Sequence, residues 1–156
     1  MMVRIEQALA PNGDVRMLVG ELEAELAPLN PPEQRHGLSL EAIFQPHILF
    51  FLAYRYHEPL GCGGIALMQD FAEVKRMYVR PAERGRSVAD AIMERLIEET
   101  RAAGRDCLRL ETGAEFPAAN RFYRRKGFAP CAIFEPYASM PPHTVASSAF
   151  LEMRLT

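Results

Sequence analysis

Three segments that follow one another directly constrain this chain most: a predicted strand, a loop rich in arginine and glycine, and a long predicted helix. Residues 71–79 have the composition of a strand, residues 80–86 read RPAERGR, and residues 87–103 carry a broad apolar stripe at helical spacing. A helix that begins straight after such a loop directs free backbone N–H groups and the positive end of its dipole at the loop. The succession therefore predicts a phosphate site at the start of the long helix.

Side chains of the loop support this interpretation without deciding it. Gly85 allows the backbone to approach a ligand closely, and Ser87 can cap the helix. Arg80, Arg84 and Arg86 add positive charge, which opposes the helix dipole by about 0.3–1 kcal/mol each unless an anion binds. The alternative is an ordinary capped helix with solvated arginines, because short loops that contain glycine are weak motifs.

The remaining elements predict a mixed sheet. Strands are expected at residues 3–9, 47–56, 62–68, 71–79, 107–111, 132–135 and 148–155, and helices at 15–26, 39–44, 87–103 and 117–126. This order predicts an α/β (α+β) fold: a mixed, largely antiparallel central sheet of about six to seven strands, with helices on both faces. A length of 156 residues with 49% hydrophobic side chains fits a single domain over residues 1–156.

Composition excludes several classes of function. The formal charge of -2 argues against nucleic acid as a partner, and the apolar run at residues 48–54 is far too short to span a membrane. Three scattered cysteines indicate reduced thiols and a cytoplasmic protein rather than a disulfide framework. Four histidines without paired spacing give no metal site.

Two further segments carry a resemblance. Residues 72–79 read AEVKRMYV, directly before the loop, and residues 119–128 read ANRFYRRKGF. With the loop, they resemble the GNAT superfamily of acyl-CoA-dependent N-acetyltransferases, firmly from about Leu49 to Phe128. The loop is similar to the family's Q/R-x-x-G-x-G/A pyrophosphate motif, and the later segment to its N-x-x-F-Y-x-x-x-G-F helix. Ser87 replaces the central glycine of the first motif; because serine is small and keeps its N–H, we expect the turn to survive.

The resemblance implies how acetyl-CoA would be held. The loop backbone would bind the coenzyme A pyrophosphate through Arg84, Gly85, Arg86, Ser87, Val88 and Ala89. The preceding strand would separate from its neighbour, so that Met77, Tyr78 and Val79 hydrogen-bond the pantetheine arm. Asn120 matches the asparagine that bonds the same arm.

The resemblance also implies two catalytic residues. Tyr123 matches the tyrosine that protonates the leaving thiolate, and an unperturbed phenol pKa of about 10 exceeds that of a thiol at about 8.5. The alternative is a half-buried tyrosine on an amphipathic helix. Glu73 matches the strand glutamate that serves some members as general base, directly or through water. The alternative is a strand carboxylate paired with Lys75 or Arg76.

Alternation leaves the orientation of Glu73 unsettled. A period of two places Glu73 on one face with Lys75, Met77 and Val79, a mixed set that a β-bulge could re-aim. Glu111 either points into an acceptor cavity or caps the next turn.

These expectations amount to an N-acetyltransferase that moves acetyl from acetyl-CoA to a primary amine of a small molecule or peptide by direct attack, without a metal. The acceptor is not identified, because the segments 30–44 and 136–148 match no acceptor motif. A non-catalytic acyl-CoA-binding or sensing module is the alternative, and it would need neither Tyr123 nor Glu73. The oligomeric state is open, with a homodimer common in the family.

Overall fold

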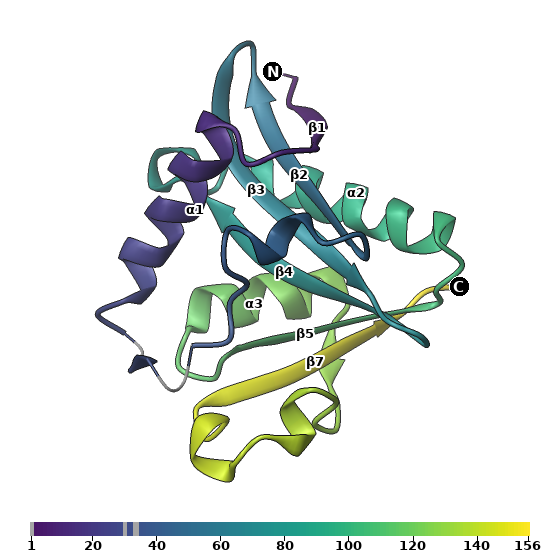
Figure 1. Ribbon diagram of the computed structural model, residues 1–156. Helices are drawn as coiled ribbons and strands as arrows, with labels where there is room; N and C mark the ends of the chain where they lie inside the picture. The colour runs from purple at the N-terminus through teal and green to yellow at the C-terminus, as the bar shows by residue number, and fades with distance from the viewer. Residues whose placement is uncertain (1, 30, 33–34) are drawn as a thin grey trace.

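The computed structural model describes residues 2–29, 31–32 and 35–156, and within them seven strands form one sheet in the order β1-β2-β3-β4-β5-β7-β6 (Figure 1). The strands are β1 (Arg4–Ala8), β2 (Ile48–Arg55), β3 (Glu58–Leu67), β4 (Ala72–Val79), β5 (Cys107–Gly113), β6 (Ala129–Pro130) and β7 (Ser148–Arg154). Neighbouring strands run antiparallel except for β4 and β5. The predicted mixed, largely antiparallel sheet is confirmed.

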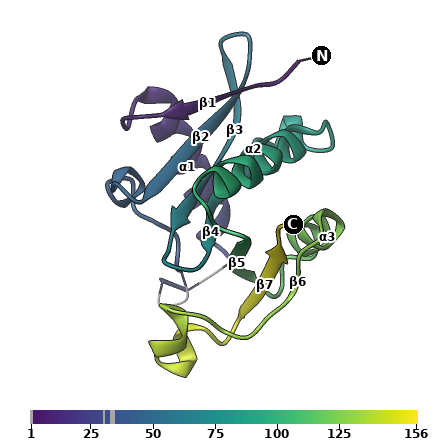
Figure 2. The same ribbon diagram turned by 90° about the vertical axis from the view of Figure 1, so that its right-hand side faces the viewer.

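Helices cover both faces of this sheet. Helix α1 (Gly13–Leu26) lies on one face, whereas α2 (Val88–Ala102) and α3 (Pro117–Lys126) lie on the other (Figures 1 and 2). The start of α1 is fixed by Asn12, whose Oδ1 accepts a hydrogen bond from Val15 N at 3.0 Å. The end of α3 is fixed by Gly127, whose φ of 108° suits a residue without a Cβ.

Each face has its own apolar core. Ile92, Met93 and Leu96 of α2 are fully buried against the sheet on one side. On the other side Val15 and Leu18 of α1 are fully buried, and the short 3-10 helix η2 (Ala42–Phe44) packs beside them. Burying one such side chain contributes about 1.5–3 kcal/mol, so the two cores hold the helices to the sheet.

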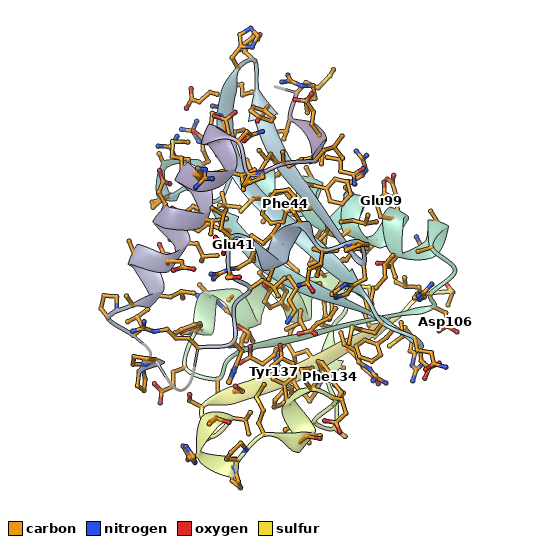
Figure 3. The ribbon with its side chains drawn as sticks, viewed as in Figure 1. Glu41, Phe44, Glu99, Asp106, Phe134 and Tyr137 are labelled. Atoms are coloured by element: carbon orange, nitrogen blue, oxygen red, sulfur yellow. The ribbon has the colours of Figure 1, made fainter. Side chains whose placement is uncertain are left out.

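One predicted strand is wrong. Residues 132–135 are irregular, and the edge strand β6 is instead Ala129–Pro130, paired with β7. The apolar character of this stretch serves packing, because Phe134 is buried edge-on against Tyr137 and Phe150, both at 5.5 Å between ring centroids. Figure 3 labels Phe134 and Tyr137. Tyr137 begins another short 3-10 helix, η4 (Tyr137–Ser139), and η5 (Pro142–Thr144) follows it.

Within the segment expected to shape the acceptor site, 30–44, residues 30, 33 and 34 lie outside the described residues. No helix in the described part of the chain is long and apolar enough to cross a membrane.

Candidate active site

A pocket opens where β4 and β5 separate. These parallel strands pair only at Ala72↔Leu108 and Glu73↔Arg109, although β4 continues to Val79 and β5 to Gly113. Beyond the last pair, both strands line a pocket of about 1440 Å³. The separation that the resemblance implied is therefore present. Of the predicted cofactor-binding residues, those on the pocket wall are Met77, Tyr78, Val79, Arg84, Gly85, Ser87, Val88 and Ala89. Arg86 and Asn120 lie outside that wall.

The loop before α2 has the backbone of an anion site. Gly85 and Ser87 both have positive φ, of 77° and 67°, so the chain turns sharply just before the helix begins. The expectation that Ser87 caps α2 is wrong: its side chain makes no capping hydrogen bond, because a capping side chain needs an extended backbone and Ser87 is left-handed. The first N–H groups of α2 are thus left without a capping side chain at the pocket wall.

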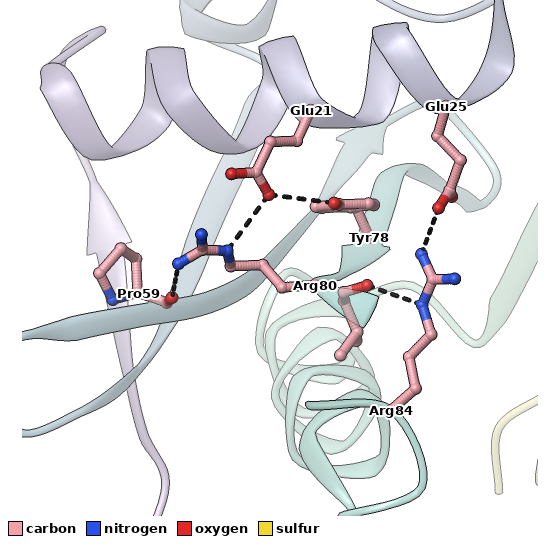
Figure 4. Close-up of polar contacts among 7 residues, drawn as sticks. Glu21, Glu25, Pro59, Tyr78, Arg80 and Arg84 are labelled. Carbon is pink, nitrogen blue, oxygen red and sulfur yellow. Dashed lines mark hydrogen bonds and ion pairs between the residues drawn. The ribbon is translucent and has the colours of Figure 1, made fainter. Parts of the chain in front are cut away.

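Helix α1 neutralises two arginines near this loop (Figure 4). Arg84 Nη2 lies 2.6 Å from Glu25 Oε1, and Arg84 Nε donates to the carbonyl of Val79 at 2.9 Å. Arg80 Nε lies 3.2 Å from Glu21, which also accepts from the Tyr78 hydroxyl at 3.0 Å. These glutamates of α1, which is far from the loop in sequence, therefore reduce the predicted electrostatic repulsion between the arginines and the α2 dipole.

A β-bulge in β4 resolves the orientation of Glu73. The register shifts at Gly63 of β3, which faces both Arg76 and Met77, and Arg76 has a φ of 54°. Glu73 therefore shares a face with Tyr78, toward α1 and the C-terminal segment. The opposite face, toward α2, holds Val74, Met77 and Val79. Simple alternation, which grouped Glu73 with Met77 and Val79, is corrected by this bulge.

Tyr123 lies on the pocket wall at α3. It is 8% exposed, and its ring packs edge-on against Phe122 and Phe128. Burial, followed by the charge of Glu111, raises the pKa of Tyr123 to about 12. The hydroxyl therefore stays protonated at physiological pH.

Asn120 holds the start of α3 to the end of β5. Its Nδ2 donates to the carbonyls of Gly113, at 3.0 Å, and Phe116, at 2.8 Å. Both amide hydrogens are thus used within the chain. Its contact with the pantetheine arm stays a prediction, and the side-chain oxygen is the atom left for it.

Glu73 lies in a buried polar cluster rather than on the pocket wall. It is 2% exposed; its Oε2 accepts from the Tyr137 hydroxyl at 2.6 Å and lies 3.0 Å from Lys75 Nζ. Lys75 Nζ also donates to the Tyr137 hydroxyl at 2.9 Å. Burial, with the nearby charge of Glu73, raises the pKa of Tyr137 well above its ordinary range. The contacts of Glu73 match the alternative of a strand carboxylate paired with Lys75, while its role as a base stays a prediction.

Glu111 faces the pocket from the end of β5. Its Oε2 accepts a hydrogen bond from the Ser148 hydroxyl at 2.6 Å. Burial raises the pKa of Glu111 above the ordinary carboxyl value, although Ser148 and nearby cations oppose the shift. Of the two readings of Glu111, the one that points it into a cavity agrees with this placement.

Sequence reasoning missed His36 and Tyr137. His36 is on the pocket wall, and its ring lies edge-on to Tyr137 at 5.5 Å between centroids. The two residues meet across about a hundred positions of sequence, and no motif surrounds either one. Among the described residues, no three His, Cys, Asp or Glu side chains gather as a metal site requires.

Comparison with known proteins places this geometry in a family. The family model described as an acetyltransferase (GNAT) domain matches residues 46–130, more than half of the chain. The chain belongs to the GNAT family. A relative from Azospirillum brasilense named IAA acetyltransferase is 40% identical over 129 residues, which cover 81% of this chain and 84% of the relative. The uncharacterized N-acetyltransferase YsnE of Bacillus subtilis is 32% identical, over 88% of this chain and 90% of its own length.

Solved GNAT-like structures agree with the fold. A Klebsiella pneumoniae structure assigned to the acyl-CoA N-acyltransferases has a TM-score of 0.79 and 27% identity, and covers 99% of both chains. PaiA N-acetyltransferase from Thermoplasma acidophilum, solved in complex with coenzyme A, has a TM-score of 0.75 and 15% identity over 99% of both chains. As a GNAT protein, the chain is an enzyme of the acyltransferase class.

Proposed function

We propose that this GNAT enzyme is a single-domain N-acetyltransferase that moves acetyl from acetyl-CoA to a primary amine of a small molecule or peptide. One observation carries the proposal: a single pocket connects the loop before α2, the open edge of β4, Tyr123 and Glu111. The residues that would bind the phosphate, hold an extended arm and donate a proton thus line the same pocket as the Glu111 carboxylate. Three unpaired cysteines fit a reducing compartment such as the cytoplasm.

The cofactor end of the pocket would bind acetyl-CoA mainly through backbone groups. The N–H groups from Arg84 to Ala89 and the α2 dipole suit the pyrophosphate. The open edge of β4, from Met77 to Val79, suits the amide groups of the pantetheine arm, which would bond it as an added strand does. The thioester would then lie near Tyr123.

Transfer would proceed by direct attack. The amine lone pair adds to the thioester carbonyl carbon, the C–S bond breaks, and the leaving thiolate takes the hydroxyl proton of Tyr123. Tyr123 regains a proton from the nitrogen of the new amide. Most of the acceleration would come from holding the thioester and the amine together, because pre-oriented reactants avoid the entropy cost of meeting.

The experiment that tests this function measures thiol release from acetyl-CoA with a panel of amines: spermidine, kanamycin and a lysine-containing peptide. An acyltransferase gives amine-dependent thiol release and an N-acetylated product by mass spectrometry. The competing proposal, a non-catalytic acyl-CoA-binding module, predicts calorimetric binding of acetyl-CoA without product from any amine. If the protein neither binds acetyl-CoA nor forms product, both proposed functions are contradicted.

A further inference from the structure

A backbone carbonyl sets the tautomer of His36 at the wall of the pocket. Its Nε2 lies 2.6 Å from the backbone carbonyl oxygen of Thr144. A carbonyl oxygen only accepts hydrogen bonds, so Nε2 carries the hydrogen. In the neutral imidazole this leaves Nδ1 with a lone pair, and no described residue hydrogen-bonds Nδ1. The arrangement is that of an imidazole oriented by one nitrogen and available for proton transfer at the other.

Charged groups surround this ring on several elements. Glu111 of β5 is close enough for a charge on His36 to lower its pKa. Tyr137 of η4 contacts the ring itself, with Glu73 and Lys75 bonded to its hydroxyl. Next to His36 in the chain, Gly37 lies against the guanidinium of Arg76. His36 and Glu111 thus line the same pocket, where a carboxylate can attract a cationic amine.

We propose that His36 is the general base that removes a proton from the ammonium group of the substrate amine. This role rests on the proposed acetyltransferase function. Glu111 attracts the ammonium group R–NH3+. One N–H bond of the ammonium breaks, its proton forms a bond to Nδ1 of His36, and the nitrogen keeps the electron pair for attack on the thioester. The imidazolium then releases the proton to solvent. The overall balance is one acetyl group transferred, one thiol formed and one proton released.

Tyr137 is a positioning residue in this scheme. Its ring supports the His36 ring, and its hydroxyl is held between Lys75 and Glu73. In this scheme Glu73 acts through Tyr137 rather than on the amine. Tyr137→Phe keeps the ring that contacts His36 and removes only the hydroxyl, so the pH profile should keep its acidic limb even if stability falls.

The tautomer is tested without any acceptor. Nitrogen NMR of the wild-type protein labelled at histidine distinguishes Nε2–H from Nδ1–H, and His36→Gln assigns the signal. We expect the Nε2–H form for neutral His36, with protonation at Nδ1 on acidification. A neutral Nδ1–H form would overturn the proposal, because the lone pair would then face Thr144.

The kinetic test compares His36→Gln with His57→Gln, a matched change at an exposed histidine of the β2–β3 turn. With the amine of the panel that reacts fastest, His36→Gln should lower kcat/KM at neutral pH by about 10²–10³-fold and abolish or move the acidic limb. The deficit should shrink at high pH, where the amine is already free. The control should match wild type. An unchanged acidic limb in a folded His36→Gln variant would overturn the proposal.

Failure of this inference is distinguishable from failure of the proposed function. If wild type transfers acetyl but His36→Gln keeps the wild-type pH profile, only the role of His36 is wrong. If Glu73→Gln rather than His36→Gln removes the acidic limb, Glu73 is the base and His36 is not. If wild type gives no product with any amine, the proposed function itself is contradicted, whereas the tautomer measurement still confirms or refutes the arrangement of His36.

Discussion

At the scale of single residues, burial decides which candidate can hold or release a proton. Tyr123 is 8% exposed and its pKa is raised to about 12, so its hydroxyl stays protonated at neutral pH. Tyr123→Phe keeps the ring packing and removes that proton. The turnover number should fall by about 10²–10⁴-fold, with acetyl-CoA affinity by calorimetry nearly unchanged. Tyr56→Phe, at a residue 82% exposed, is the control; wild-type turnover in Tyr123→Phe would make Tyr123 structural.

For Glu73, burial bears on the stability of the fold, because this carboxylate forms an ion pair with Lys75 inside the protein. Its carboxylate offsets the charge of Lys75, whose side chain is 13% exposed, so Glu73→Gln leaves an uncompensated cation inside the protein. We expect a loss of about 3 kcal/mol in unfolding free energy, measured with urea. The double variant Glu73→Gln/Lys75→Met should recover much of that loss. Unchanged stability, together with a lost acidic limb in the rate profile, would instead support the base role.

Residue identities were predictable where a short motif carries them. Tyr123 and Asn120 lie three positions apart in a recognisable helix segment, and Pro117–Lys126 is the helix that the sequence predicts. His36 and Tyr137 were not predictable, because their relevance comes from a ring contact and from hydrogen bonds to Thr144 and Glu73 that join distant segments. Spacing rules describe neighbours along one element and carry no information on such contacts.

At the scale of elements, the turn into α2 depends on backbone conformation more than on side chains. Ser87 has a φ of 67°, so its N–H can face the pocket while its hydroxyl caps nothing. Ser87→Glu should place a carboxylate beside the pyrophosphate, a like-charge contact that costs several kcal/mol, or about 100-fold or more in acetyl-CoA affinity. Calorimetry measures the loss, and circular dichroism confirms that the fold persists.

The matched control at this turn is Ser87→Gly. Glycine tolerates positive φ, so the variant should fold within about 1 kcal/mol of wild type and bind acetyl-CoA at least as well. Equal affinity for Ser87→Glu and Ser87→Gly would contradict the assignment of this loop to the pyrophosphate.

The bulge in β4 shows why element-level prediction from sequence is incomplete. The strand itself is correctly predicted, to within a residue, from its composition. The face to which each side chain of β4 points is not correctly predicted, because Arg76 has a left-handed backbone and breaks the alternation after Lys75. The identity of Arg76 does not predict its φ of 54°. At the bulge the opposite residue is Gly63, and a Cβ there would lie 2.9 Å from side-chain atoms of Ile92 and Met77.

At the scale of the whole molecule, the pocket is a consequence of topology. Among the strands of the described residues, β4 and β5 pair in parallel and the other neighbours are antiparallel, and α2 provides the crossover between β4 and β5. The order of elements was therefore enough to predict a mixed sheet with helices on both faces. The packing of the irregular C-terminal segment was not predictable, because it depends on contacts between buried aromatic rings such as Phe134 and Tyr137.

The same burial of aromatic hydroxyls makes the stability of the molecule sensitive to alkali. Burial is the largest cause that raises the pKa of Tyr78 to about 12 and of Tyr123 to about 12, and it raises the pKa of Tyr54 and Tyr137 further. In the unfolded chain these phenols ionise near their ordinary value of about 10. The unfolded state therefore loses protons first, and stability falls as pH rises above about 10.

Each such phenol contributes a slope of about 1.4 kcal/mol per pH unit between its unfolded and folded pKa. The Cys62 thiol adds a similar loss of stability that begins at lower pH. Burial raises the pKa of this thiol to about 12, whereas a thiol in the unfolded chain ionises at about 8.5. We expect thermal unfolding followed from pH 8 to pH 11 to show a Tm that declines above pH 9 and steepens above pH 10. Tyr137→Phe removes one buried phenol and should make the alkaline decline shallower, whereas Tyr56→Phe, at an exposed position, should leave it unchanged. A flat Tm across this range, or equal slopes in the two variants, would show that the buried hydroxyls do not resist ionisation in the folded protein.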